Sequence, residues 1–391
     1  MQQQPISFHK STRLPWLVVT DLDGTLLTPQ HTVSKRSIST LSHAQRYSEH
    51  QQIDDRDIHR PIQIMIASGR SPRSIQKVID LFNGLMIPDA VLCCNGALTY
   101  NPRSKVISYP QFIPLDQALS MVQRLRSEIR VHGTYQSQFP PNENPESSGA
   151  EDLVPLSQPT PNRVTQGGEQ GQDPAERMAG RSGFACEVVW FEGRTPEGEL
   201  IYAKDTTFVC DQTWVLQRKH TIYYNYTTVE NTMEAFIESL LLHQHDPASG
   251  RAGGIIKLMA LDRNRTAADV YESLPLDVLS MSTPAIPQPN DTDIADADPV
   301  SVSYSNAFFL EIAAAGVNKG LGLKKYCEAN HIPRENVVAF GDLLNDAEML
   351  QYAGLGLCMG NGHESVKRLA DRVIETNADD GVAKEIESWF L

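Results

Sequence analysis

Short apolar runs alternate with helix-forming segments along the first hundred residues of the chain. Each apolar run has the length of a strand and ends at aspartate, serine, asparagine or glycine. The order strand, helix, strand, helix, strand predicts a doubly wound parallel sheet. The predicted strands cover residues 16–19, 62–67 and 90–94, and the predicted helices cover residues 33–43 and 74–82.

The pattern changes after about residue 98. Segments of both kinds continue, but in an order typical of α+β structure and not of βαβ repeats. Residues 136–181 and 282–300 are rich in Pro, Gln, Ser, Gly and acidic residues, so they cannot bury enough apolar surface to fold, and we expect loose insertions there. A third insertion, residues 47–60, is polar and charged. The predicted strands of this region are 106–109, 185–191, 207–209 and 255–261, and its predicted helices are 115–129, 232–242 and 267–273.

The last 90 or so residues return to α/β alternation. This layout predicts an α/β fold, with a Rossmann-like doubly wound parallel-sheet core made of residues 1–97 and 305–391. An α+β cap domain, residues 98–304, would be inserted between the two halves. The predicted strands here are 308–312, 337–340, 355–359 and 373–375, and the predicted helices are 320–330, 347–352, 364–370 and 381–390.

Composition narrows the classes of function. The net charge of −14 and the pI near 5.2 argue against a nucleic-acid partner, which needs clustered Lys and Arg. No apolar run approaches the roughly 18 residues of a membrane span, and the N-terminal residues lack a signal-peptide core, so a cytoplasmic protein without a membrane partner is expected. The six cysteines follow no CxxC spacing, which favours buried free thiols.

The polar residues at the strand ends carry the candidate chemistry. Ligands bind beyond the carboxyl ends of strands in an open parallel sheet, so these side chains would gather around one substrate. Asp21 and Asp23 are one residue apart and repel each other, which calls for a cation or a proton. Carboxylates without histidine or cysteine favour Mg²⁺ over zinc. The set, which suits phosphoryl transfer, comprises Asp21, Asp23, Ser68, Lys319, Asp342, Asn345 and Asp346.

Each of these residues also has a structural interpretation when it is taken alone. Asp21 and Asp23 could form an acidic turn, Ser68 could be a turn serine, and Lys319 could be a surface lysine at a helix start. Asp342 and Asp346 could cap a helix. Asn95 could orient substrate or a neighbouring loop, or could simply form a turn. The concordance of the whole set favours the functional interpretation.

The motifs containing these residues resemble those of the haloacid dehalogenase superfamily of phosphohydrolases, in its Cof-type branch with a large α/β cap. The four superfamily motifs occur in order, and three branch-typical segments accompany them. The superfamily motifs are DLDGT (21–25), ASGR (67–70), GVNKG (316–320) and GDLLNDAEML (341–350), and the branch segments are CNGA (94–97), MGNG (359–362) and NADDGVAKEI (377–386).

The resemblance implies a role for each site residue. Asp21 would be the nucleophile that forms an aspartyl-phosphate, and Asp23 would be the general acid and base. Mg²⁺ would be held by the Asp21 side chain, the Asp23 backbone carbonyl and Asp342, with Asp346 supporting them. The residues implied in binding phosphate or substrate are Ser68, Gly69, Lys319 and Asn345.

The expected function is a Mg²⁺-dependent phosphatase that hydrolyses small phosphomonoesters. Sugar phosphates are the favoured substrates, ahead of nucleotides, flavin mononucleotide and pyridoxal phosphate. The partner would be a small phosphorylated metabolite, and the protein a monomer or small homo-oligomer. Two alternatives stay open at this point: a phosphomutase of the same superfamily, and a non-catalytic regulatory binding module on the same fold.

Overall fold

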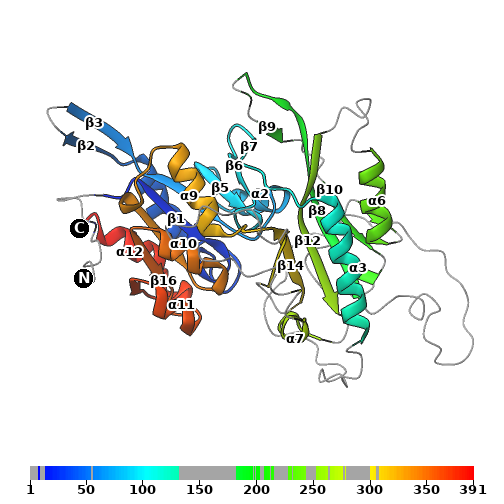
Figure 1. Cartoon of the computed structure of the whole chain (residues 1–391). Coiled ribbons are helices and arrows are strands. Elements are labelled where there is room, and N and C mark those ends of the chain that lie inside the picture. Colours follow the sequence, from blue (N-terminus) through cyan, green and yellow to red (C-terminus); the bar gives the residue numbers. More distant parts are fainter. Residues whose placement is uncertain are drawn as a thin grey trace, which may run out of the picture.

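A computed structural model describes the fold over most of the chain. The described residues are 8, 14–53, 56–131, 182–196, 198, 200–202, 207–211, 213–214, 228–230, 232–243, 252–262, 265–275, 278, 300–304 and 308–391. Two bodies lie side by side in Figure 1, with the two ends of the chain together in one of them and the cap strands in the other.

A parallel sheet forms the centre of the core body. Its strand order is β5-β4-β1-β15-β16-β17, and every neighbouring pair in this run is parallel. The strands β5, β4, β1 and β15 are mostly apolar and almost entirely buried because helices cover both faces, as expected for a parallel sheet. The strands are β1 (Leu17–Asp21), β4 (Gln63–Ala67), β5 (Ala90–Cys93), β15 (Val337–Gly341), β16 (Leu355–Cys358) and β17 (Arg372–Val373).

Alternate residues of β1 face opposite hydrophobic layers. Val18 packs in a cluster with residues of α1 (Lys35–Arg46), α2 (Pro72–Asp80) and α12 (Gly381–Ser388). Leu17 and Val19 pack in another with residues of α9 (Lys319–Ala329), α10 (Ala347–Tyr352) and α11 (Glu364–Leu369). Helices therefore cover both faces of the sheet, which confirms the predicted doubly wound fold.

The cap body is built on antiparallel strands. Its long strands β8 (Ser182–Arg194) and β12 (Ala252–Asp262) pair over most of their length, and helices α3 (Leu115–Val131) and α6 (Met233–His243) pack against them (Figure 1). The other cap elements are β9 (Leu200–Tyr202), β10 (Thr207–Asp211), β11 (Thr228–Glu230), α7 (Ala267–Ser273), β13 (Val300–Ser303) and β14 (Leu310–Ala314).

Hydrogen bonding between strands continues from the core into the cap. Strands β6 (Leu98–Tyr100) and β7 (Val106–Ser108) follow β5 and connect it to β9 and then β8. At the other crossing, β14 pairs with β12 and β13, so it belongs to the cap sheet although the boundary predicted at residue 305 puts it in the core. The sequence of an apolar strand does not show which strand it pairs with. The boundary was predicted from the alternation of elements alone, and it lies about ten residues too early.

The three predicted insertions compare differently with the structure. Residues 47–60 largely form an antiparallel hairpin of β2 (Ser48–Ile53) and β3 (Arg56–Pro61), which the polar sequence did not predict because backbone pairing needs no apolar side chains. The loose insertion predicted at 136–181 lies outside the described residues. The same holds for 282–300 except Val300, which begins β13.

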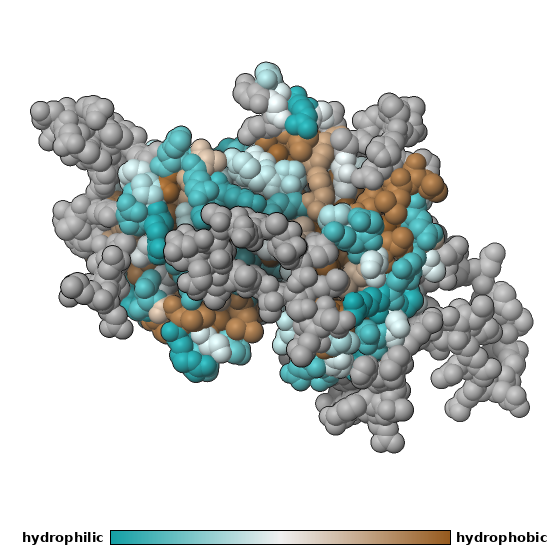
Figure 2. Space-filling view, in the orientation of Figure 1, coloured by the Kyte–Doolittle hydropathy of each residue, from teal (hydrophilic) through white to brown (hydrophobic). Residues whose placement is uncertain are grey.

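Surface hydropathy, helix length and the cysteines can be compared with the expectations drawn from composition. Figure 2 shows hydrophilic residues over much of the core, a hydrophobic patch at its lower left, and hydrophobic residues gathered near α6, where Leu242 is exposed. In the described part of the chain, no helix combines the length and apolar character needed to cross a bilayer. All six cysteines are buried and free, as predicted.

Candidate active site

Parallel pairing brings three of the predicted strand ends together at one edge of the sheet. Strand β1 lies between β4 and β15, with Asp21 opposite Ala67 and Thr20 opposite Phe340. Ser68 follows β4 directly, and Asp342 follows β15 directly. The carboxylates and the serine hydroxyl therefore meet where a substrate would arrive in this class of sheet.

Lys319 joins two of the aspartates. It is the first residue of α9 and is fully buried. Its Nζ donates to Asp21 Oδ1 at 2.6 Å and to Asp346 Oδ1 at 2.6 Å. Burial lowers the pKa of this lysine, but the Asp21 and Asp346 carboxylates outweigh burial and raise it. Lys319 is thus a charged part of the site and not a surface lysine at a helix start.

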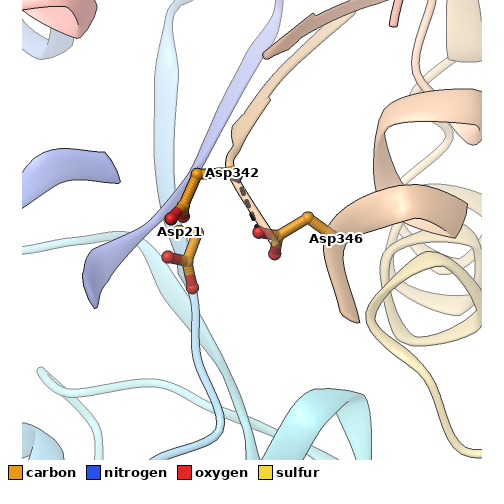
Figure 3. Close-up of side chains that lie close together, drawn as sticks. All are labelled: Asp21, Asp342 and Asp346. Atoms are coloured by element: carbon orange, nitrogen blue, oxygen red, sulfur yellow. Dashed lines mark hydrogen bonds between the residues drawn. The ribbon is translucent and has the colours of Figure 1, made fainter. Parts of the chain in front are cut away.

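Asp346 organises the loop that follows β15. Its Oδ2 accepts hydrogen bonds from the backbone N–H of Asp342 at 2.9 Å and of Leu343 at 3.0 Å. Its other oxygen is held by Lys319. Figure 3 shows the hydrogen bond between the Asp346 carboxylate and the backbone of Asp342. Both oxygens of Asp346 thus have protein donors.

Asp342 is buried and held from the side by Thr25. The Thr25 Oγ1 donates to Asp342 Oδ1 at 2.7 Å. Burial, followed by the neighbouring Asp346 carboxylate, raises the pKa of Asp342 to about 6, although the Thr25 hydrogen bond and Lys319 oppose the rise. Burial also raises the pKa of Asp21 well above its ordinary value, against the opposing effect of Lys319. Negative charge is therefore only partly compensated by the protein here.

Gly24 allows the loop after β1 to approach Asp342. Its φ is +90°, a left-handed conformation that side chains disfavour. A Cβ at this position would collide with Asp342 Oδ2. The glycine of the DLDGT motif is thus required by both its backbone angle and its neighbour.

The residues present fit a magnesium ion. Carboxylate oxygens of Asp21, Asp342 and Asp346 lie within 4.8 Å of one another. Figure 3 shows these three side chains close together. Mg²⁺ prefers such oxygen ligands. Burial, with the neighbouring carboxylates, raises the pKa of Asp21 and Asp342, and a bound cation would stabilise their charged forms.

Asp23 lies at the more open side of the site, with its side chain 46% exposed. Both of its carboxylate oxygens accept from Arg70, Oδ2 from Nε at 3.0 Å and Oδ1 from a terminal nitrogen at 2.7 Å. His31 Nδ1 lies 3.8 Å from Asp23 Oδ1. Arg70 belongs to the ASGR motif, so two motifs are joined by a bidentate ion pair.

Ser68 and Gly69 form the turn after β4. Ser68 is buried, and its Oγ accepts from the backbone N–H of Arg70 at 3.2 Å. Both residues line the same cavity as Asp21 and Asp23. The structure therefore brings the turn predicted to bind phosphate next to the two aspartates.

Asn95 connects the core to the cap. Its Oδ1 accepts from Asn345 Nδ2 at 3.2 Å, and its Nδ2 donates to Glu311 Oε2 at 3.1 Å on cap strand β14. Cys94, Asn95 and Gly96 have positive φ values of 51°, 55° and 91°, a tight turn that aims the Asn95 amide at both partners. Asn95 thus forms a turn and also contacts a motif loop.

A cavity of about 250 Å³ opens above the aspartates, between the core and the cap. Sequence reasoning missed its charged cap residues, although a signal was present: a single charge inside an otherwise apolar strand is unusual without a partner. The core residues lining it include Asp21, Asp23, Ser68, Gly69, Arg70, Arg73 and Asn345, and the cap residues are Glu187, Phe208, Trp214, Lys257, Met259, Phe309 and Glu311.

The family model for haloacid dehalogenase-like hydrolases matches residues 18–138 and 263–386, which together make up more than half of the chain. The chain belongs to the haloacid dehalogenase-like hydrolase family. The resemblance drawn from the motifs is thus confirmed. The matched ranges include all four superfamily motifs of this hydrolase and leave out most of the cap between them.

Two curated relatives illustrate the range of similarity. The hydrolase is 34% identical over 174 residues to 5-amino-6-(5-phospho-D-ribitylamino)uracil phosphatase YitU of Bacillus subtilis, a match that covers 41% of the chain and only 61% of that relative. It is 24% identical over 384 residues to pyridoxal phosphate phosphatase YbhA of Escherichia coli, which covers 96% of the chain and 98% of the relative.

Solved structures support the fold. The phosphatase BT1666 of Bacteroides thetaiotaomicron, a member of the same superfamily, matches with a TM-score of 0.56 and 18% identity, over 96% of the chain and 95% of that structure. At this identity the similarity concerns the fold alone. It confirms the predicted α/β core with an inserted cap.

Proposed function

We propose that this hydrolase is a Mg²⁺-dependent phosphatase that hydrolyses small phosphomonoesters through an aspartyl-phosphate on Asp21. The observation that carries the proposal is the position of Asp21: it lines the cavity, is buried, and has Oδ1 held by the charged Lys319. A carboxylate fixed in this way can act as a nucleophile toward a phosphorus atom seated beside Ser68. The names of the curated relatives, which are phosphatases, support the same reaction.

In the first step a carboxylate oxygen of Asp21 attacks phosphorus, and the bond from phosphorus to the leaving oxygen breaks. Asp23 gives its proton to that oxygen, so the alcohol leaves neutral. Lys319 and the Ser68–Gly69 turn stabilise the charge on the phosphoryl oxygens. In this structure Arg70 occupies both oxygens of Asp23, so the acid role requires Asp23 to exchange Arg70 for the leaving oxygen.

In the second step the Asp23 carboxylate takes a proton from water, and the water oxygen attacks phosphorus. The bond from phosphorus to the Asp21 oxygen breaks, which releases phosphate and restores both aspartates. The Asp21 side chain, the Asp23 backbone carbonyl and Asp342 would hold the magnesium ion, with Asp346 supporting them. When bound, the ion neutralises charge on the carboxylates and the phosphoryl oxygens.

The substrate class proposed from the sequence is a sugar phosphate, and the protein is proposed to be a monomer or small homo-oligomer. The test is release of free phosphate from a panel of sugar phosphates, nucleotides and p-nitrophenyl phosphate, with Mg²⁺ and with chelator. Asp21→Asn keeps the size of the side chain but removes the nucleophile, so turnover is expected to fall by at least about a thousandfold.

Asp80→Asn is the matched control, because Asp80 is exposed at the end of α2 and does not line the cavity. Metal-dependent release in the wild type and Asp80→Asn, lost in a folded Asp21→Asn, is the expected result. Full activity in Asp21→Asn would show that Asp21 is not the nucleophile. Turnover of a sugar phosphate without free phosphate would instead indicate a mutase.

A further inference from the structure

Two ion pairs line the cavity where the cap meets the core. Arg73 of α2 lies 3.0 Å from Glu187 Oε1 on β8, and Lys257 of β12 pairs with Glu311 of β14. Lys257, Glu187 and Glu311 are each less than a tenth exposed. The Arg73 side chain is 23% exposed. The three buried charges interact strongly with whatever enters the cavity.

Both cations have further contacts besides their carboxylates. The Lys257 Nζ also donates to the Gly69 carbonyl at 3.2 Å and lies 5.8 Å from the centre of the Phe309 ring. The Arg73 guanidinium lies 5.3 Å from the centre of the Phe208 ring. Each of these two positive charges therefore already has a carboxylate and an aromatic face. The two pairs together carry no net charge.

The rest of the described cap wall is apolar. Phe208, Trp214, Met259 and Phe309 line it. The Trp214 ring lies 5.6 Å from the Phe309 ring and 6.1 Å from the Phe208 ring, centre to centre. Such side chains favour the carbon face of a ring, while the ion pairs present donors and acceptors for hydroxyl groups.

A second anionic group on the substrate would be unfavourable here. Moving a phosphate or carboxylate into this wall removes its water, and Glu187 and Glu311 repel it. Lys257 and Arg73 compensate this repulsion only in part, because each is already paired with its own carboxylate. Selectivity of this kind arises from rejecting the wrong ligand.

We propose that Glu187 and Glu311 are specificity-determining residues that exclude an anionic leaving group, so that the substrate is the monophosphate of an uncharged, ring-bearing alcohol such as a hexose. This inference rests on the proposed phosphatase function. Glu311 neutralises Lys257, and Glu187 neutralises Arg73. Removing either carboxylate would leave a cation that favours an anionic leaving group.

The test compares glucose 6-phosphate with glucose 1,6-bisphosphate, which differ only in the second phosphate. For the wild type with Mg²⁺, kcat/KM for the monophosphate is expected to exceed that for the bisphosphate by about tenfold or more. In Glu311→Gln this ratio should fall by about tenfold, because Lys257 becomes available to the second phosphate. Glu187→Gln should move the ratio in the same direction and serves as an independent variant.

The matched control is Glu234→Gln. Glu234 of α6 also forms a cap ion pair, with Arg126 Nε at 2.6 Å from its Oε1, but it does not line the cavity. This variant should keep the wild-type ratio. The inference is overturned if the wild type uses the bisphosphate as well as the monophosphate, or if both glutamate variants lower kcat/KM for the two substrates by the same factor. Absence of metal-dependent phosphate release from every substrate would overturn the proposed function itself.

Discussion

Replacing Lys319 with methionine should destabilise the fold strongly. Methionine keeps a long, unbranched side chain but removes the charge that pairs with Asp21 and Asp346 at 2.6 Å each. Both carboxylates are at least nine-tenths buried, so they would lose their common cation without gaining water. Breaking a buried ion pair by removing one partner costs about 3–5 kcal/mol, and we expect a loss of unfolding free energy in that range.

Arg36→Met provides the comparison. Arg36 pairs with Glu387 at 3.0 Å, but both side chains are more than a third exposed. Exposed pairs contribute about 1 kcal/mol or less, so this variant should remain close to the wild type. Urea denaturation followed by circular dichroism, in chelator at pH 7, measures all three proteins. A Lys319→Met cost no larger than that of Arg36→Met would refute the reasoning.

The pH dependence gives a second check on the same variant. The pKa of Lys319 is raised, so its stabilising contribution is complete below its ordinary value of 10.5 and is lost only as the pH rises through the folded pKa. The lysine is therefore charged throughout the range from pH 5 to 7. Without it, the Asp21 carboxylate, whose pKa burial already raises, binds a proton more readily in the folded state, so the variant should lose stability as the pH rises. Its deficit should be smaller at pH 5 than at pH 7, and a deficit independent of pH would contradict this explanation.

Two further substitutions test the loop after β1. Thr25→Val removes the hydrogen bond to Asp342 Oδ1 with little change of shape. It should weaken Mg²⁺ affinity by about tenfold or more in a calorimetric titration. Unchanged affinity would show that Thr25 does not orient Asp342. Gly24→Ala places a Cβ against Asp342 Oδ2 at a φ of +90°. The free energy of unfolding should therefore fall by at least about 1 kcal/mol. An unchanged urea midpoint would contradict the described conformation of this loop.

The predicted elements of the core agree with the structure because each is a local property of the chain. The strand at 337–340 and the helix at 347–352 were placed within a residue of their observed bounds. Apolar runs of strand length with polar ends need helices on both faces, which leaves few arrangements. The candidate site residues were predicted in the same way, since a parallel sheet places its carboxyl strand ends at one edge.

The sequence by itself therefore determined the family, the doubly wound core and the motif residues at its edge. Only the tertiary structure decided the pairing of β14 with the cap and the full burial of Lys319 between two aspartates. It also brought Lys257 to Glu311 and Arg73 to Glu187. These partners are separated by 54 and 114 residues in the chain, and local patterns carry no information on which distant strands meet. Folding alone brings them to one cavity.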